Sequence, residues 1–423
     1  MPNFSLSDDV FQEAARRFPT PFYLYDERGI RETAREMNAA FAWAPSFREY
    51  FAVKALPNPQ ILKVLRQEGC GADCSSECEL LLAEMAGLSG RKIMFSANAM
   101  PPEEFDHARA LGAIINLDDI SDIDLLARHG GVPEEVCVRY NPGGDFTLGN
   151  AIMGAPGESK YGWTREQLTE GLARLRALGM RRFGLHAFLA SNTTDNSYFP
   201  KLAGILFDLG KELEGQTGVP LAFVNLSGGI GIPYLPGEKK ADAAMIGRGV
   251  QQEYVRVFGD PARAQVGIKA ELGRYMTGPH GWLVTRVVHE KKIHRDYIGV
   301  DACAVNLMRP AMYGAYHHVT VCGKRDLPAD HVYDITGSLC ENNDKFAWER
   351  KLPEIRIGDL LLIHDTGAHG SAMGYNYNGR LRGAEVLYTA DGDYRLIRRA
   401  ETPADYFATL DVDPDYSTIS PGR

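Results

Sequence analysis

The chain has 423 residues, of which 44% are hydrophobic and 24% are charged. This length exceeds a single small module and suggests two or three domains of about 150 residues each, while the composition excludes wholesale disorder. Lysine and arginine number 46 against 55 aspartate and glutamate residues, and the formal net charge of -9 argues against broad nucleic-acid binding. Any anionic ligand must therefore meet a local basic site.

The sequence shows no sign of a membrane or secreted protein. No apolar run approaches the ~20 residues that cross a bilayer, so we expect no membrane span. Residues 1–10 carry neither a basic region nor an apolar stretch, so we expect no secretion signal. Seven cysteines stand at irregular spacings in a chain large enough to fold without cross-links. They predict reduced thiols in a cytoplasmic protein.

Eight short apolar runs end in polar residues and are separated by helix-like patterns. The runs begin at Tyr50, Gly71, Ile93, Ala113, Glu135, Phe183, Phe223 and Gly267. Short buried strands that alternate with amphipathic helices indicate βαβ units. An open doubly wound sheet would give the same local pattern, but the count of eight favours a TIM-like (β/α)8 barrel. We therefore expect an α/β fold with this barrel over residues 28–280.

After Pro279 the pattern changes to alternating runs with no helices between them. Examples are GWLVTRVVHE, HHVTVCG and DLLLIHDTG. Such runs are typical of antiparallel strands and predict a C-terminal β-sandwich or β-barrel domain. The segment FYLYDE, which begins at Phe22, is expected to pair with that sheet. The second domain is thus expected to combine residues 1–27 with residues 281–423.

Residues suited to catalysis fall at the ends of the predicted barrel strands, where the active sites of such barrels lie. Lys54 stands in the apolar stretch YFAVKAL, either as a partly desolvated amine for imine chemistry or as half of a structural ion pair. The seventh run ends in Ser-Gly-Gly-Ile-Gly at residues 227–231, where backbone amides can approach an anion. The eighth run ends in Glu271 with Arg274 close behind.

An amine, a phosphate cradle and a buried acid at one rim suit pyridoxal phosphate. The lysine would hold the cofactor, the glycines and arginine its phosphate, and the acid would keep its ring nitrogen protonated. Each part also has a simpler interpretation. The glycine pair could be only a turn, and Glu271 with Arg274 could be a surface ion pair.

Two other cofactor sites fit the sequence less well. The glycine-rich loop does not match G-x-G-x-x-G because Tyr234 occupies the third glycine position, which argues against a Rossmann site. Cys70, Cys74 and Cys78 resemble the iron–sulfur motif of radical enzymes but have one residue too many in the second gap. Their spacing predicts an ordinary buried seam along one helix.

The β-rich part adds further polar motifs. Arg309 and Tyr313, four residues apart, can clamp a carboxylate, and Cys340 with Glu341 sets a thiol beside an acid. Each could equally be a surface charge or a loop residue. Four histidines could ligate a metal but lack a helical H-E-x-x-H pattern, and we predict no metal site. These histidines are His317, His318, His364 and His369.

An ordered set of motifs resembles the alanine racemase-fold pyridoxal-phosphate decarboxylases, and within them the diaminopimelate decarboxylases. The resemblance extends from about residue 20 to about residue 407. Its motifs are FAVKA, GADCSSECEL, RYNPG, SKYG, NLSGGIG, ELGR, NLMRPAMYGAYH, SLCENND and DTGAHGSAMGYNYNGR. The resemblance implies pyridoxal 5'-phosphate as cofactor, an amino-acid substrate and a homodimer with composite active sites.

The resemblance also implies roles at matching positions that bind the cofactor. Lys54 matches the lysine that carries the cofactor, and Glu271 matches the partner of the ring nitrogen. Gly228, Gly229, Gly273 and Ser191 resemble the phosphate cradle. The remaining positions implied to bind the cofactor are Asp73, Arg139, Phe188, Arg274 and His369.

At the substrate, the resemblance implies a second group of residues. Arg274, Arg309 and Tyr313 match positions that hold the carboxylate at the far, non-reacting end. Glu341 matches the acid that meets the amine at that end. Cys340 matches a thiol supplied by the neighbouring subunit, which either donates a proton or only shapes the pocket.

Three departures mark the chain as divergent within this family. Phe188 replaces the histidine that stacks on the cofactor ring, and His186, two residues earlier, is expected to point to the opposite face of its strand. His369 replaces a phosphate-binding tyrosine, and Ser227 replaces the first glycine of a triplet. Phe188 can still stack but cannot be charged or donate a hydrogen bond.

The function that follows is decarboxylation of meso-diaminopimelate at its D-centre, which gives L-lysine and carbon dioxide. A second hypothesis keeps the cofactor but changes the substrate to another diamino or acidic D-amino acid, a carboxyspermidine-like compound or a carrier-bound amino acid. A third, a catalytically silent homologue that binds a partner, is disfavoured because Lys54, Glu271 and Cys340 are all present. A radical iron–sulfur enzyme is the remaining rival.

Overall fold

The computed structural model describes residues 6–144 and 156–411. The chain divides into two compact units. The barrel unit comprises Gly29–Pro233 and Gly237–Gly278, and the β-rich unit comprises Met1–Arg28, Tyr234–Pro236 and Pro279–Arg423. The outer ends of the expected β-rich domain, at residues 1 and 423, lie outside the described residues.

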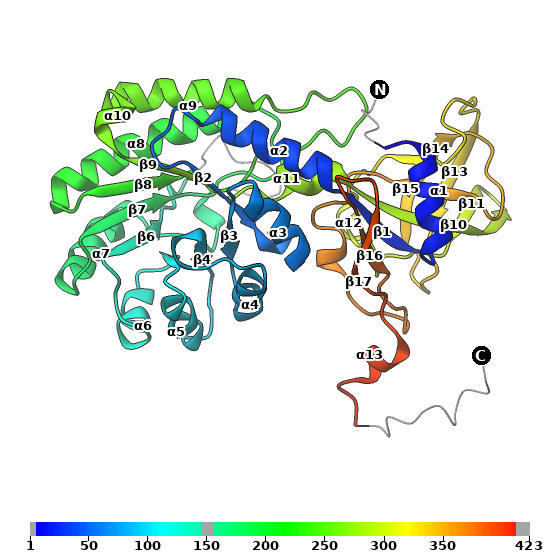
Figure 1. The fold of residues 1–423 in the computed structure, drawn as a ribbon, viewed down its shortest axis with the longest axis horizontal. Coiled ribbons are helices and arrows are strands. Elements are labelled where there is room, and N and C mark those ends of the chain that lie inside the picture. Colours follow the sequence, from blue (N-terminus) through cyan, green and yellow to red (C-terminus); the bar gives the residue numbers. More distant parts are fainter. Residues whose placement is uncertain (1–5, 145–155, 412–423) are drawn as a thin grey trace. The chain divides into compact units, whose positions relative to one another are not determined.

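Eight parallel strands close into a barrel in the barrel unit (Figure 1). They are β2 (Arg48–Ala52), β3 (Gly71–Cys74), β4 (Ile93–Ser96), β5 (Ile114–Leu117), β6 (Glu135–Arg139), β7 (Arg182–His186), β8 (Leu221–Asn225) and β9 (Gly267–Ala270). Pairing of Arg48 with Lys269 and of Glu49 with Ala270 closes the first strand on the last. Each of the eight predicted runs overlaps one of these strands, and the predicted (β/α)8 barrel is confirmed.

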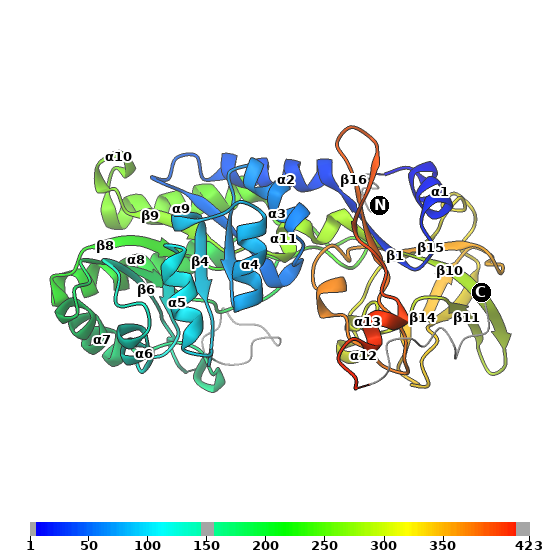
Figure 2. The ribbon, with the colours of Figure 1, turned by 60° about the horizontal axis from the view of Figure 1, so that its bottom comes forward.

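Helices alternate with the strands and surround the barrel (Figures 1 and 2). They are α2 (Glu27–Ala40), α3 (Pro59–Gln67), α4 (Glu77–Met85), α5 (Glu103–Ala110), α6 (Asp122–Arg128), α7 (Arg165–Ala177), α8 (Tyr198–Thr217), α9 (Ala243–Phe258), α10 (Pro261–Ala264) and α11 (Arg274–Thr277). Short 3-10 turns are η1 (Val53–Ala55), η2 (Gly90–Lys92), η3 (Pro156–Glu158) and η4 (Gly278–His280).

Local sequence explains where these helices begin. Asn58 caps α3 by accepting a hydrogen bond from the Gln60 backbone amide at 3.0 Å, and Pro59 opens the helix with a suitable backbone angle. Thr164 and Gln167 form a reciprocal capping box at the start of α7. Such caps satisfy amides that would otherwise lack partners, so α3 and α7 begin at defined residues.

The barrel interior changes from apolar to polar along the strands. One apolar cluster is formed by Tyr50, Met94, Ile114, Cys137 and Phe223. Polar side chains follow at or just after the carboxyl ends of several strands, where an α/β barrel places its binding site. These buried polar residues are Asp73, Asn116, His186, Asn225 and Glu271. The fold therefore carries buried polar groups to the end of the barrel at which a ligand is expected.

The β-rich unit contains a nine-stranded sheet. Its strands are β1 (Phe22–Asp26), β10 (Gly281–Lys292), β11 (Asp296–Val300), β12 (Val319–Val321), β13 (His331–Thr336), β14 (Lys345–Leu352), β15 (Leu360–Ile363), β16 (Ala384–Tyr388) and β17 (Tyr394–Arg398). The same unit holds α1 (Asp8–Arg17), α12 (Arg309–Tyr313), η5 (Ser371–Met373) and α13 (Pro403–Phe407). The main path runs β14-β13-β11-β10-β1-β16-β17.

The predicted pairing of the Phe22 segment with this sheet is confirmed, since β1 lies between β10 and β16. The expectation of antiparallel strands holds for most pairs but is wrong for two. β1 pairs with β16 in parallel, and β11 pairs with β13 in parallel. Both pairs join segments far apart in the chain or linked by a long connection, so no tight hairpin forces the antiparallel direction.

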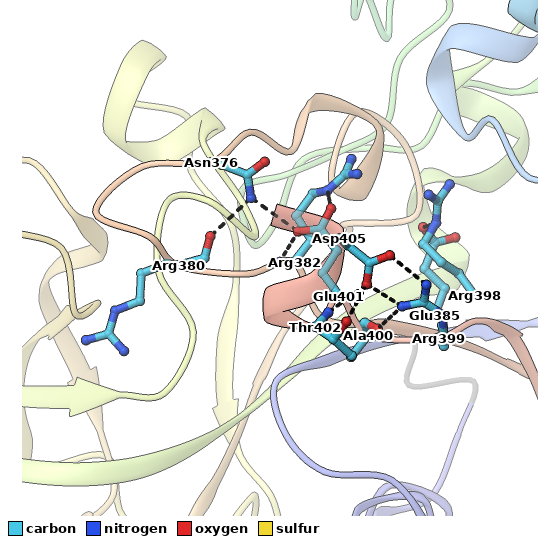
Figure 3. A network of polar contacts seen from close by, with 10 residues as sticks. All are labelled: Asn376, Arg380, Arg382, Glu385, Arg398, Arg399, Ala400, Glu401, Thr402 and Asp405. Atoms are coloured by element: carbon cyan, nitrogen blue, oxygen red, sulfur yellow. Dashed lines mark hydrogen bonds and ion pairs between the residues drawn. The ribbon is translucent and has the colours of Figure 1, made fainter. Parts of the chain in front are cut away.

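Ion pairs anchor the last described segment of this unit (Figure 3). Glu401 accepts a hydrogen bond from Arg382 Nε at 2.5 Å, and Arg399 binds both carboxylate oxygens of Asp405 at 2.5 and 2.6 Å. The buried Glu385 pairs with Arg398 at 2.6 Å. Bidentate contacts of this kind fix geometry as well as charge, so the chain after β17 is held in a defined place.

The cysteine seam expected on one helix is wrong. Cys70 precedes β3, Cys74 ends that strand, and Cys78 lies in α4. The strand interrupts the helical repeat, so Cys70 and Cys74 are buried while Cys78 is exposed. Within the described ranges, every helix is too short or too polar to cross a bilayer.

Candidate active site

Lys54 follows β2 in the single turn η1 at the carboxyl end of the barrel. Its side chain is exposed, so the partial desolvation expected from the sequence is not seen. Among the described residues it forms no ion pair within 4.0 Å, so the alternative of a structural ion pair is not supported either. Its Nζ lies 6.0 Å from the centre of the Phe188 ring. The amine is therefore available for a ligand at this end of the barrel.

Glu271 follows β9 and is the most heavily hydrogen-bonded acid of this region. It is 7% exposed. Its Oε1 accepts a hydrogen bond from Asn225 Nδ2 at 2.6 Å. Its Oε2 accepts from Ser227 Oγ at 3.0 Å and lies 3.1 Å from His186 Nε2. Three neighbouring side chains from β7, β8 and the loop after β8 therefore hold this one carboxylate.

The surroundings of Glu271 and Asp73 move their pKa values in opposite directions. Burial alone would raise the pKa of Glu271, but His186 and the hydrogen bonds from Asn225 and Ser227 lower it overall. Burial raises the pKa of Asp73, and the nearby Glu271 carboxylate raises it further, against the opposing charge of Lys54. The site thus favours one ionised carboxylate and one protonated carboxyl group, an arrangement typical of functional acids.

Three buried polar atoms of the barrel interior have no hydrogen-bond partner within the described residues. They are Asp73 Oδ1, Asn116 Oδ1 and His186 Nδ1. Buried polar groups are normally satisfied, and an unsatisfied one costs about 1–3 kcal/mol. Their concentration at one end of one barrel indicates a place where a polar ligand or ordered water completes the network.

The expectation for His186 is wrong. It lies in the same interior network as Glu271 and is only 2% exposed. Side chains two residues apart along a strand share a face, so His186 and Phe188 belong to the same face rather than to opposite faces. Sequence reasoning therefore missed His186 and Asn225 as site residues. The period of two along β7, applied correctly, would have found His186.

The loops after β7 and β8 are joined where the phosphate cradle is expected. Thr193 N donates to Gly229 O at 2.9 Å, and Gly231 N donates to Thr193 O at 2.8 Å. A Cβ at Gly228 would lie 2.7 Å from Glu271 O, and one at Gly229, whose φ is +114°, would lie 2.8 Å from Ala190 O. Neither position has space for a side chain, which agrees with the close backbone packing expected of a glycine phosphate cradle.

Two other expected cradle residues flank these loops. Ser191 is half-buried and precedes Thr193 in the loop after β7. A Cβ at Gly273 would lie 2.6 Å from Ala55 Cβ, beside the turn that carries Lys54. Arg274 is half-buried and begins α11 directly after Gly273. The structure therefore brings the expected cradle residues to the same end of the barrel as Lys54.

Arg139 and Phe188 line a small hollow at the ends of β6 and β7. Arg139 Nη1 pairs with Asp118 Oδ1 at 3.1 Å, and its guanidinium lies 4.2 Å from the Tyr161 ring centre. The Phe188 ring centre lies 6.0 Å from the Arg139 guanidinium and is half-buried. The ring therefore has two cations, Arg139 and Lys54, near it at the rim.

Arg309 and Tyr313 mark the two ends of α12 in the β-rich unit. Arg309 Nη1 donates to the Tyr234 hydroxyl at 3.1 Å, and its guanidinium lies 5.1 Å from that ring centre. Tyr313 is 64% exposed. An arginine oriented by an aromatic ring and an accessible phenol are suitable partners for a substrate carboxylate.

Cys340 and Glu341 lie in the loop between β13 and β14, and both side chains are exposed. The buried Asp344 anchors this loop, because its two carboxylate oxygens accept from Ala304 N at 2.7 Å and Leu339 N at 2.8 Å. Cys340 N donates to Asn378 Oδ1 at 2.8 Å. A thiol and a carboxylate are thus presented outward on a loop with fixed ends.

His317 and His364, two of the histidines considered as metal ligands, form hydrogen bonds within the β-rich unit. His364 accepts from Trp282 Nε1 at 3.0 Å, and its other ring nitrogen lies 2.8 Å from Thr320 Oγ1. His317 Nδ1 lies 2.8 Å from His364 O. His369 is half-buried with a φ of +54°. No three histidine, cysteine or acidic side chains in residues 6–144 and 156–411 are grouped as metal ligands.

The donor set of the barrel fits pyridoxal phosphate. The exposed amine of Lys54 suits the aldehyde of that cofactor, and the ionised, buried carboxylate of Glu271 suits its ring nitrogen. The glycine amides in the loops after β8 and β9 suit its phosphate. The unsatisfied atoms Asp73 Oδ1 and His186 Nδ1 leave polar contacts for its ring substituents. The chemistry that the site can perform is stabilisation of negative charge at the carbon next to a substrate amine.

Known proteins share this combination. A family model described as the pyridoxal binding domain of pyridoxal-dependent decarboxylases matches residues 27–278. Protein TabA from Pseudomonas amygdali pv. tabaci is 40% identical over 405 residues, which cover 96% of this chain and 94% of that protein. Diaminopimelate decarboxylase from Methanothermobacter thermautotrophicus is 34% identical over 397 residues, which cover 93% of this chain and 92% of that protein.

A solved structure shows the same fold. The crystal structure of diaminopimelate decarboxylase from M. jannaschii in complex with L-lysine matches with a TM-score of 0.88 at 29% identity, covering 95% of this chain and 94% of that chain. The segment matched by the family model is the barrel that carries Lys54 and Glu271. The protein therefore belongs to the family of pyridoxal-dependent decarboxylases, with pyridoxal phosphate as its cofactor.

Proposed function

We propose that this decarboxylase acts on meso-diaminopimelate and releases L-lysine and carbon dioxide. The observation that carries the proposal is the Glu271 carboxylate, held by three neighbours at the same end of the barrel as Lys54. Similarity to a diaminopimelate decarboxylase over 93% of the chain supports the choice of substrate. The barrel that we propose to bind the cofactor is residues 28–280, and the β-rich domain is residues 1–27 with 281–423.

The residues of the barrel divide the work at the cofactor. Bound pyridoxal phosphate supplies a ring that takes up the electron pair left behind when carbon dioxide departs. Lys54 Nζ would hold the cofactor through a covalent bond to its aldehyde carbon. Glu271 keeps a proton on the ring nitrogen, and Phe188 stacks on the ring and excludes water from one of its faces.

The phosphate of the cofactor is assigned to the loops that carry the glycines. Backbone amides at Gly228, Gly229 and Gly273 can donate to it without a steric barrier. Ser191 and His369 add side-chain donors. Asp73, with its pKa raised by burial and by Glu271, is assigned to a polar group of the ring as a protonated acid. Arg139 and Arg274 supply positive charge at the rim.

Residues with affinity for a carboxylate and an amine select the substrate. Arg274, Arg309 and Tyr313 bind the carboxylate that the reaction does not remove, and Glu341 binds the distant amine. Ornithine has only the carboxylate that decarboxylation removes. It therefore offers the two arginines no carboxylate at its non-reacting end. Two charged contacts at the non-reacting end therefore discriminate between these classes of substrate.

The assembly that we propose is a homodimer in which each subunit contributes Cys340 to the active site of the other. The thiol is exposed on a loop whose ends are fixed by Asp344, which suits a contribution to a neighbouring site. Cys340 then delivers a proton to the carbon that loses carbon dioxide, or shapes the pocket around it. The free thiols Cys78 and Cys340 on the surface suit a reducing, cytoplasmic location.

The substrate is tested by incubating the holoenzyme with meso-diaminopimelate and measuring L-lysine by mass spectrometry. We expect stoichiometric lysine and carbon dioxide, and no turnover of L-ornithine or L-arginine. Arg309→Met should raise KM for meso-diaminopimelate about 10- to 100-fold, because a charged hydrogen bond is lost. Turnover of another amino acid without lysine formation would contradict the substrate assignment but not the cofactor assignment.

The shared site is tested by mixing inactive subunits. Lys54→Ala and Cys340→Ala are purified separately, mixed in equal amounts and allowed to exchange subunits. A composite site restores about one quarter of the wild-type activity, because half of the dimers are mixed and each holds one intact site. Activity that stays at the level of the two separate variants contradicts the exchange of Cys340.

A second candidate substrate class is favoured by a specific observation. Phe188 stands where the resembling family has a histidine, and protein TabA, at 40% identity, is more similar than the diaminopimelate decarboxylase at 34%. The alternative is another diamino or acidic amino acid, including a carboxyspermidine-like or carrier-bound one. A panel compared by kcat/KM decides between them, with the highest value expected for meso-diaminopimelate.

A further inference from the structure

We propose that Ser227 is a positioning residue for Glu271, whose hydroxyl fills one acceptor site of the carboxylate and leaves one site on Oε1 for the cofactor's ring nitrogen. The inference rests on the proposed role of Glu271 and adds a residue to it. Ser227 acts on the cofactor only through the Glu271 carboxylate.

The backbone at Ser227 shows that a side chain is kept there at a cost. Its φ is +55°, in the left-handed region that glycine adopts freely and other residues adopt with a penalty of about 1 kcal/mol. Its backbone N donates to Asn225 Oδ1 at 2.8 Å, and its carbonyl accepts from Glu271 N at 2.7 Å. A glycine would satisfy the same backbone contacts without strain, so the backbone alone gives no reason for serine.

The hydroxyl provides the reason. Ser227 Oγ donates to Glu271 Oε2 at 3.0 Å, and the residue is only 4% exposed. A hydrogen bond to a buried carboxylate stabilises by about 1.5–3 kcal/mol, which exceeds the backbone penalty. The serine is therefore best explained by its contact with Glu271.

Counting acceptor sites gives the carboxylate an orientation. An ionised carboxylate has about four lone-pair sites, two on each oxygen. Oε2 has two neighbours, Ser227 Oγ and His186 Nε2, while Oε1 has one, Asn225 Nδ2. Ser227 thereby blocks the second site of Oε2 and leaves the open site on Oε1. Without the hydroxyl, either oxygen could meet the ring nitrogen.

Other ionisable groups also act on Glu271 and stay constant in the test. Its electrostatic neighbours are His186 on β7, Asp73 on β3, Glu49 on β2 and Cys137 on β6. None of them is changed by a substitution at Ser227. A difference in the protonation of the cofactor's ring nitrogen can therefore be attributed to the lost hydroxyl.

The test compares Ser227→Ala with Ser227→Gly in the holoenzyme. Alanine removes the hydroxyl and keeps the backbone strain, whereas glycine removes both. If the hydroxyl positions Glu271, both variants lower kcat about 10-fold with little change in KM. Both also shift the 15N resonance of labelled cofactor toward that of the unprotonated ring nitrogen. Thermal unfolding of the apoprotein should separate them, with the glycine variant more stable than the alanine variant because only alanine keeps the backbone strain.

Ser46 supplies matched controls. It has a φ of +49° and lies before β2, at the amino end of the barrel. Ser46→Ala and Ser46→Gly repeat both backbone changes away from Glu271, and should leave kcat and the 15N resonance unchanged.

The outcomes separate this inference from the proposed function. A Ser227→Ala enzyme with wild-type kcat and an unshifted resonance overturns the role of Ser227 and leaves Glu271 intact. A loss of kcat in Ser227→Gly but not in Ser227→Ala also overturns it, because the backbone would then be responsible. A wild-type holoenzyme whose ring nitrogen is unprotonated removes the proposed role of Glu271, and the inference fails with it.

Discussion

The two ends of the barrel both bury charge, but they treat it differently. At the amino ends of the strands, Glu135 pairs with Arg91 at 2.6 Å and with Arg182 at 2.7 Å. Lys269, which is 6% exposed, donates to Ser46 O at 2.6 Å. These two buried residues meet opposite charges or a carbonyl of the chain itself, as expected for a region that stabilises the fold.

At the carboxyl ends, the chain leaves its polar groups incomplete. Glu271 is held by a histidine and two neutral donors, and no arginine or lysine forms an ion pair with it within the described residues. Asp73 Oδ1 and His186 Nδ1 have no partner in the described ranges. The difference shows how one fold separates stability from function. Charges are neutralised at one end, and at the other they are arranged for a ligand.

The strongest way to break this comparison is to neutralise one acid at each end. Glu271→Gln should lower kcat about 10²- to 10³-fold, because the ring nitrogen loses its ionised partner. Glu135→Gln should lower the free energy of unfolding by about 1–3 kcal/mol, since a buried carboxylate loses its ion pairs with two half-exposed arginines, while kcat of the folded enzyme is preserved. Steady-state kinetics and chemical unfolding of both variants decide. Similar kinetic losses in both variants would erase the proposed difference between the ends.

Gly229→Ala sharpens the assignment of the phosphate cradle. The new Cβ would lie 2.8 Å from Ala190 O at a φ of +114°, so we expect a loss of about 1–3 kcal/mol in unfolding free energy. Affinity for pyridoxal phosphate should also fall, as measured by equilibrium dialysis. Gly215→Ala in α8 is the control, because nothing lies within 4 Å of its Cβ. The control substitution should stabilise the fold slightly and leave the affinity for pyridoxal phosphate unchanged. Weakened cofactor binding in the control would argue that the loss at Gly229 does not come from the phosphate cradle.

Lys269 gives a test of the amino end that depends on pH. Burial lowers its pKa to about 8, with Arg48 and Arg91 adding to the effect. Between pH 8 and the ordinary value of 10.5 the unfolded chain binds more protons than the folded chain, so stability rises with pH in this window. Relative to Lys269→Met, wild type should gain on the order of 1–3 kcal/mol in unfolding free energy from pH 7 to pH 10.5. A stability difference between wild type and Lys269→Met that stays constant with pH would contradict a lowered pKa for Lys269.

The sequence is sufficient for the barrel because its signal is local. Each strand is a short apolar run with a polar end, and such runs can be found without knowing which strands pair. Lys54 and Glu271 are predicted for the same reason, since each lies toward the end of one of these runs, just after the strand itself. The parallel pairing of β1 with β16 could not be predicted, because it joins residues more than 350 positions apart.

The environment of Glu271 depends on closure of the barrel. Its three hydrogen-bonding neighbours are spread over 42 residues of the chain: His186, Asn225 and Ser227. They reach one carboxylate only when β7, β8 and β9 are adjacent. The motif NLSGGIG contains two of them, but it does not reveal which side chains point inward. The error at His186 had a simpler cause, because residues two apart in a strand lie on one face and the period was misapplied.

The central claim is that Lys54 carries pyridoxal phosphate, and it has a direct measurement. The holoenzyme is reduced with borohydride, digested and mapped by mass spectrometry, with Lys54→Arg as the control. We predict that the cofactor mass is found on the peptide containing Lys54, and that the Lys54→Arg variant is neither labelled nor active. A label on another lysine, or a yellow and fully active Lys54→Arg enzyme, would contradict the account.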